Sequence, residues 1–111
     1  MAWLDVCSVA DLQPNSGVCA LVQGQQVALF YFADSKEVYA ISNFDPFGQA
    51  NVLSRGLIGD INEQPVVASP LYKQHFNLET GRCLEDDTVQ IPAYPVRIEN
   101  DRVYIGVTEA A

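Results

Sequence analysis

The side chains best suited to chemistry gather in two short loops, residues 43–48 and residues 69–81. Asp45 in the first loop offers hard carboxylate oxygens, which suit magnesium or calcium. Ser69 in the second loop lacks a G-x-S-x-G elbow and an identified base, so it resembles a serine nucleophile only superficially. His75 is the only histidine, and catalysis would need a positioned partner that the sequence does not identify. We therefore interpret His75 as a hydrogen-bonding or interface residue and expect no catalytic residue in this chain.

The spacing within the two loops resembles the Rieske pattern, Cys-Pro-x-His-x-x-x-Phe with a following glycine turn, together with its matching Cys-Pro-His loop. The residues that carry the likeness are Asp45-Pro46-Phe47, Ser69-Pro70-Leu71-Tyr72, Phe76 and Gly81. In this alignment Asp45 and Ser69 stand at the cysteine positions, and Phe47 and Tyr72 stand at the histidine positions. A Rieske cluster needs two thiolates on one iron and two neutral imidazoles on the other. The resemblance therefore implies that this chain keeps a two-loop tip, about residues 43–81, and binds neither a metal nor a cofactor there.

Longer runs resemble one group of this superfamily, the small subunit of bacterial NAD(P)H-dependent assimilatory nitrite reductase. The likeness extends over about residues 3–107, and the runs that carry it are Asn43–Phe47, Val52–Gly56, Ser69–Phe76, Gly81–Leu84 and Tyr94–Arg97. The resemblance implies a non-catalytic subunit that docks on and supports a large catalytic subunit. In that family the large subunit carries FAD, siroheme and a [4Fe–4S] cluster, and it reduces nitrite to ammonium. This chain would then belong to an oxidoreductase and have no activity alone.

Two other functions stay open at this point. The chain could be a free-standing cluster-less Rieske-like module for protein interaction or regulation, because a fold does not determine a function. It could also be an electron carrier with an atypical iron site, although the side chains at the four ligand positions argue against this. An unbiased pull-down that identifies the binding partner would test the first alternative. A visible spectrum recorded after anaerobic reconstitution with iron would test the second.

The partner interface is expected at the second loop and its surroundings. The candidate residues are Tyr72, Lys73, Gln74, His75 and Arg55. Tyrosine is a frequent interface anchor, and the polar side chains would form a rim around it. Phe47 and Tyr72 have a competing interpretation, in which both rings cap the core between the loops and fill the volume that a cluster would occupy.

Composition limits the partners and the compartment. The chain has 111 residues, a formal net charge of −8 and 49% hydrophobic residues. This length predicts one domain, residues 1–111, and the acidic balance argues against nucleic acid and anionic membrane surfaces as partners. Three cysteines without close-spaced companions predict reduced and mostly buried thiols, and therefore a cytoplasmic protein. The run 85–87 is interpreted as a solvated acidic turn, with a docking face for a basic partner as the alternative.

Short alternating runs with turn residues between them predict an all-β fold, a Rieske-type ferredoxin-like sandwich or partial barrel with a small two-loop subdomain. Strands are expected at 3–7, 18–22, 27–32, 37–41, 65–68, 75–78, 94–99 and 103–107. Ser8 is expected to cap a single helical turn over residues 9–12. The segment 53–60 contains Gly56 and Gly59 and is interpreted as glycine-rich corners.

Overall fold

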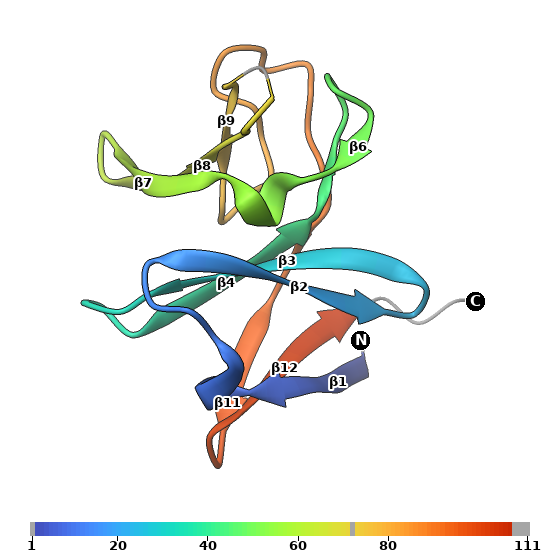
Figure 1. Cartoon of the computed structure of the whole chain (residues 1–111), viewed down its shortest axis with the longest axis vertical. Coiled ribbons are helices and arrows are strands. Elements are labelled where there is room, and N and C mark those ends of the chain that lie inside the picture. The colour runs from blue at the N-terminus through green and yellow to red at the C-terminus, as the bar shows by residue number, and fades with distance from the viewer. Residues whose placement is uncertain (1, 72, 108–111) are drawn as a thin grey trace.

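The computed structural model describes residues 2–71 and 73–107, and strands make up most of it (Figure 1). Its strands and its two short 3₁₀ helices (η) are, in chain order, β1 (Ala2–Ser8), η1 (Val9–Asp11), β2 (Ser16–Val22), β3 (Gln25–Phe32), β4 (Glu37–Ser42), β5 (Phe44–Asp45), β6 (Ala50–Asn51), η2 (Leu53–Arg55), β7 (Leu57–Ile61), β8 (Gln64–Ala68), β9 (His75–Asn77), β10 (Ala93–Tyr94), β11 (Val96–Glu99) and β12 (Arg102–Val107). The all-β prediction is confirmed. No helix in the described ranges has the length and apolar character to cross a membrane.

The strands form three main sheets that stack as layers (Figure 1). The lowest sheet in the view has the order β1-β12-β11, the middle sheet has the order β10-β4-β3-β2, and the uppermost has the order β7-β8-β9. The pair β5-β6 stands beside the uppermost sheet. Because all pairings between these strands are antiparallel, short turns suffice for most connections.

Strand β3 places its two faces in two different hydrophobic clusters, because successive side chains of a strand point to opposite faces. Val27 and Leu29 belong to the cluster shared with the lowest sheet. Ala28 and Phe30 belong to the cluster shared with the uppermost layer. All four side chains are at most 1% exposed. The run therefore reads as continuously apolar in the sequence, as is typical of a strand that is covered on both faces.

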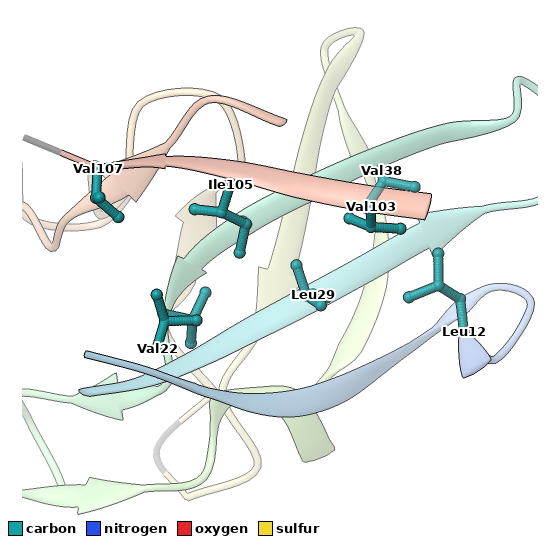
Figure 2. Packing of buried hydrophobic residues seen from close by; sticks show 9 residues of the cluster. Leu12, Val22, Leu29, Val38, Val103, Ile105 and Val107 are labelled. Atoms are coloured by element: carbon teal, nitrogen blue, oxygen red, sulfur yellow. The ribbon is translucent and has the colours of Figure 1, made fainter. Parts of the chain in front are cut away.

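Figure 2 shows the lower cluster, which joins the middle sheet to β12 and the lowest sheet. Its buried members are Leu12, Val22, Val27, Leu29, Val38, Ala40, Val103, Ile105 and Val107. The upper cluster holds the two-loop subdomain on the middle sheet, and its buried members are Ala28, Phe30, Ile41, Leu53, Val67, Phe76, Leu78, Cys83 and Ile91. Both loops of the tip are thus supported by the upper cluster.

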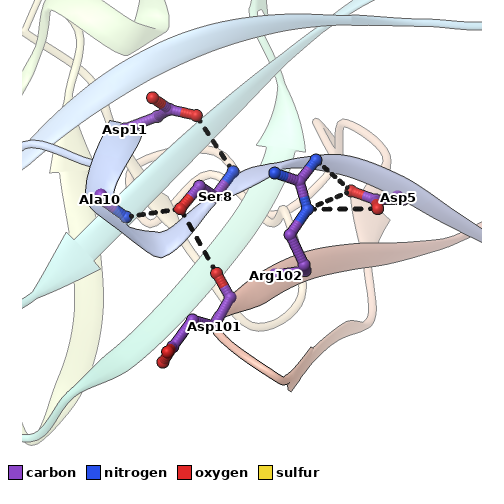
Figure 3. Close-up of polar contacts among 6 residues, drawn as sticks. All are labelled: Asp5, Ser8, Ala10, Asp11, Asp101 and Arg102. Atoms are coloured by element: carbon purple, nitrogen blue, oxygen red, sulfur yellow. Dashed lines mark hydrogen bonds and ion pairs between the residues drawn. The ribbon is translucent and has the colours of Figure 1, made fainter.

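The first helical turn begins where the sequence predicts it (Figure 3). The Ser8 hydroxyl accepts a hydrogen bond from the Ala10 N–H at 3.2 Å, and the Asp11 carboxylate accepts one from the Ser8 N–H at 3.0 Å. This reciprocal arrangement satisfies N–H groups that have no partner within a helix. Beside it, Arg102 on β12 donates from Nη2 to Asp5 Oδ1 on β1 at 2.8 Å, an ion pair across two neighbouring strands.

Two expectations from the sequence are wrong in detail. Residues 53–60 form the short helix η2 and most of strand β7, where corners alone were predicted. The β7–β8 hairpin closes with Asn62 and Glu63, both at positive φ (51° and 67°). Such turns favour glycine, which is absent here.

The thiols are less buried than expected, because Cys19 is exposed while Cys7 is half-buried and Cys83 is buried. Cys19 lies on β2, the edge strand of the middle sheet.

Candidate functional site

A hydrogen bond between Asp45 and Ser69 joins the two loops of the tip. Asp45 ends β5, and the first loop continues from it to β6. Ser69 follows β8, and the second loop continues from it to β9. The Ser69 hydroxyl donates to Asp45 Oδ2. The two residues are 0% and 1% exposed, so the contact is closed off from solvent.

The remaining acceptors of this pair bind backbone N–H groups within the loops. Asp45 Oδ1 accepts from the Phe47 N–H at 2.9 Å and from the Gly48 N–H at 3.3 Å. Ser69 Oγ accepts from the Leu71 N–H at 3.2 Å. A side-chain oxygen that accepts from the backbone N–H two or three residues further along the chain commonly stabilises a tight turn. Both oxygens of the Asp45 carboxyl group are therefore used inside the tip.

Phe47 joins the first loop to the upper cluster. Its ring is half-buried and packs against the upper cluster, with its centroid 6.2 Å from that of Phe76. An aromatic pair at this separation contributes about 1 kcal/mol beyond the area that it buries. Tyr72, the other ring expected to cap the core, lies outside the described residues, so a joint aromatic plug stays a proposal.

The structure brings three of the expected interface residues to one depression. Arg55, Lys73 and His75 line it together with the end of β8 and the start of the second loop. Arg55 and Lys73 are exposed, and His75 is half-buried. Gln74 is half-buried as well, and its Oε1 atom has no hydrogen-bond partner among the described residues. With Tyr72 outside the described residues, the five-residue interface stays a proposal.

His75 has a carboxylate partner that the sequence did not identify. Glu85 Oε1 accepts from the His75 N–H at 2.7 Å, and Glu85 Oε2 lies 2.6 Å from His75 Nδ1. Burial alone would raise the pKa of Glu85, but these hydrogen bonds and the charge of His75 lower it below the ordinary value of 4.5. The run 85–87 is therefore more than a solvated turn, because Glu85 contacts the backbone N–H and the side chain of His75 at the start of β9.

Replacing Glu85 with glutamine is expected to lower the free energy of unfolding at pH 7 by about 0.5 kcal/mol, because the Glu85 carboxylate contacts His75 at a partly exposed site, where such contacts are worth little. The His75 and Glu85 side chains are 32% and 49% exposed. Since folding lowers the pKa of Glu85, its contribution is present above pH 4.5 and is lost as the pH falls through the lowered value. Urea unfolding of both proteins between pH 3 and pH 7 measures this. A difference in stability that persists in acid would contradict it.

Asn43 fixes the first loop at the base of the tip, a role that was not predicted from the sequence. It is 2% exposed, its Nδ2 donates to Gln26 Oε1 at 3.0 Å, and its Oδ1 accepts from the Ser54 N–H at 2.7 Å. These bonds tie the first loop to the β2–β3 hairpin and to η2. The signal in the sequence was a polar residue directly between a buried strand and the loop, where a buried amide must find partners.

The comparisons with known proteins agree with this geometry. The model of the "Rieske-like [2Fe-2S] domain" family matches residues 2–106. The "Nitrite reductase (NADH) small subunit" of Salmonella typhimurium is 46% identical over 103 residues, which are 93% of this chain and 95% of the relative. The chain belongs to the Rieske-like family of nitrite reductase small subunits.

Solved structures in this small-subunit family have the same fold. The putative NADH-dependent nitrite reductase small subunit from Mycobacterium tuberculosis superposes with a TM-score of 0.91 at 40% identity, covering 98% of this chain and 97% of that one. A longer protein carries a related sequence as one part of its chain. The "Nitrite reductase [NAD(P)H] large subunit" of Klebsiella oxytoca is 41% identical over 104 residues, which are 94% of this chain and 11% of that protein.

The family name implies a [2Fe–2S] cluster, and the residues at this tip do not fit one. Phe47 has no donor atom, and both oxygens of the Asp45 carboxyl group bind hydrogen-bond donors within the loops. Soft, sulfur-bridged iron takes thiolate and imidazole ligands, and Asp45 and Ser69 supply hard oxygen instead. Within the described ranges, no three His, Cys, Asp or Glu side chains gather in a way that could hold a metal ion. This small-subunit sequence therefore lacks the ligand chemistry of the wider family.

Proposed function

We propose that this protein is the non-catalytic small subunit of an NAD(P)H-dependent nitrite reductase, and that it docks on and supports the large subunit. Membership of the small-subunit family gives it a role in this oxidoreductase. The proposal adds that the chain has no activity alone and that nitrite reduction to ammonium, in nitrate and nitrite assimilation, takes place on the partner. FAD, siroheme and [4Fe–4S] would all belong to that partner, as the family resemblance implies.

The Klebsiella oxytoca relative is the observation that carries this proposal. In that protein a segment resembling nearly this whole chain is part of a polypeptide named as the large subunit. Two sequences that are separate chains in one organism and one chain in another are expected to work side by side. The tip supports a role in recognition over a role in electron transfer, because the residues that the resemblance places at the four ligand positions include no thiolate and no imidazole.

The free thiols support a cytoplasmic location within the same proposal. Cys7, Cys19 and Cys83 are all unpaired. Unpaired thiols are typical of reducing compartments, where disulfides do not persist.

Co-purification with the large subunit tests the proposed function. The two purified chains, mixed at micromolar concentration, are expected to elute together from a size-exclusion column. Nitrite-dependent oxidation of reduced nicotinamide is expected from the large subunit and its complex, and none from this chain alone. Separate elution at that concentration, or nitrite reduction by the isolated chain, would contradict the proposal.

A further inference from the structure

The outer face of the uppermost sheet carries an open groove that the tip chemistry does not explain. Two adjoining depressions of about 270 and 310 Å³ share three lining residues, Leu57, Ala68 and His75. These three are cross-strand neighbours, since Leu57 pairs with Ala68 and Ala68 pairs with His75. A cross-strand row lies on one face of a sheet. The next row, Ile58–Val67–Phe76, packs on the opposite face against the upper cluster.

Apart from His75, the middle of the groove is apolar, and it is open to solvent. Leu57 is 78% exposed, more than any other large hydrophobic side chain of the described residues. Ile61 and Ala68 are half-buried beside it, and Pro70 at the start of the second loop is exposed. A single exposed leucine is ordinary, but an exposed leucine in a concave, mostly apolar groove beside charged residues is typical of a surface that another chain covers.

The end of the groove near the tip carries positive charge, because Arg55 and Lys73 line it. The ion pairs in the described ranges use His75, Arg97 and Arg102, so neither Arg55 nor Lys73 has a carboxylate partner there. The whole chain has only 6 Lys and Arg against 14 Asp and Glu. Two uncompensated cations at one end of an apolar groove are therefore a local exception on an acidic protein.

We propose that this groove binds an extended acidic segment of the large subunit. Carboxylates of the segment would face Arg55 and Lys73, and an apolar side chain that follows them would cover Leu57 and Ala68. Strand β7 (Leu57–Ile61) runs along the groove, and its length of roughly 16 Å matches about five extended residues. The proposal rests on the proposed function, because it assumes that the large subunit is the partner, and it adds where and by what chemistry that partner is bound.

Charge reversal tests the basic end of the groove. The double variant Arg55→Glu and Lys73→Glu is expected to bind the large subunit about 30-fold more weakly, since attraction between opposite charges becomes repulsion. Affinity of the original protein is expected to fall with added salt more steeply than that of the variant. Titration calorimetry of the holoenzyme large subunit with each protein, at 50 and 300 mM salt, measures both effects.

The control for charge compares two single variants, Lys73→Glu in the groove and Lys36→Glu at the β3–β4 turn, away from the uppermost sheet (Figure 1). Both change a lysine that has no carboxylate partner among the described residues, and both change the net charge by the same amount. Lys73→Glu is expected to weaken binding about fivefold, and Lys36→Glu is expected to change affinity by less than about threefold, because charges far from a contact are screened. An equal loss in the two variants would mean that only the overall charge of the protein matters, and it would overturn the groove proposal.

The apolar part of the groove has its own matched pair. Leu57→Ser is expected to weaken binding about tenfold with the fold intact, because its side chain loses contact area with the partner. Leu21→Ser on β2 alters a leucine that is 74% exposed and lies outside the groove, so its binding should be unchanged. Circular dichroism confirms folding of each variant.

The outcomes separate the two proposals. If the unaltered chain does not bind the large subunit at micromolar concentration, the proposed function is wrong. If it binds and the groove variants bind equally well, the docking function stands and the groove is wrong.

Discussion

Replacing Asp45 with alanine is expected to lower the free energy of unfolding by about 3 kcal/mol, because buried donors that lose their acceptor each cost about 1–3 kcal/mol. Three donors are affected: the Ser69 hydroxyl and the N–H groups of Phe47 and Gly48. Asp45 and Ser69 are 0% and 1% exposed, so water has little access to the place of the carboxyl group unless the tip opens. Urea unfolding followed by circular dichroism measures the loss, and hydrogen exchange at Phe47 and Gly48 locates it.

Asp45→Asn is the matched control. Its amide oxygen can still accept from the two backbone N–H groups, and its amide nitrogen can donate to Ser69 Oγ. We therefore expect a loss of about 1 kcal/mol, well below that of the alanine variant. Equal losses in the two variants would show that these hydrogen bonds do not hold the loops together.

Gly81→Ala is expected to lower the free energy of unfolding by a similar amount, about 3 kcal/mol, because overpacking and a left-handed side chain each cost of the order of 1–2 kcal/mol. Gly81 has a φ of +78°, and a Cβ atom there would lie 1.9 Å from the Ile91 carbonyl oxygen. The segment around Ile91 cannot easily move away, since the Ile91 N–H donates to the Gly81 carbonyl oxygen at 2.9 Å. The melting temperature should fall by roughly 15 °C in a protein of this size.

Gly24→Ala separates the cost of the left-handed conformation from the cost of overpacking. Gly24 has the same φ of +78°, and a Cβ atom added there would have no other atom within 4 Å. Only the left-handed conformation is then unfavourable, and the expected loss is about 1 kcal/mol. Thermal unfolding of both variants measures the difference. If Gly81→Ala were no less stable than Gly24→Ala, the close approach of Ile91 would not constrain this turn.

Local patterns in the sequence were sufficient for most strands and for the turns with clear chemistry. Alternation in the run Val103, Ile105 and Val107 predicted β12, and Ser8 predicted the capped turn that follows β1. Strand β7 was missed because Gly56 and Gly59 indicated corners, and its turn of Asn62 and Glu63 lacks the glycine that marks such hairpins. There, pairing with β8 outweighs the local preference.

Partners that are distant in the sequence were beyond such patterns. Nothing near His75 indicated Glu85, because the contact depends on how the chain returns beside β9 after Gly81. Asn43 was part of a recognised motif, but its bonds to Gln26 and Ser54 need the β2–β3 hairpin and η2 to come together. Long-range contacts of this kind are set by packing rather than by local propensity.

The sequence by itself determined the family and predicted a tip without iron ligands, because both depend only on which residues stand at which spacing. Phe47 supplies no ligand in any fold. Only the tertiary structure decided that Asp45 and Ser69 bind each other, and that Arg55, Leu57 and Lys73 line one groove. Those relations depend on how separate strands and loops pack on a common core, and hydrogen bonds and charges act only over the distances that this packing creates.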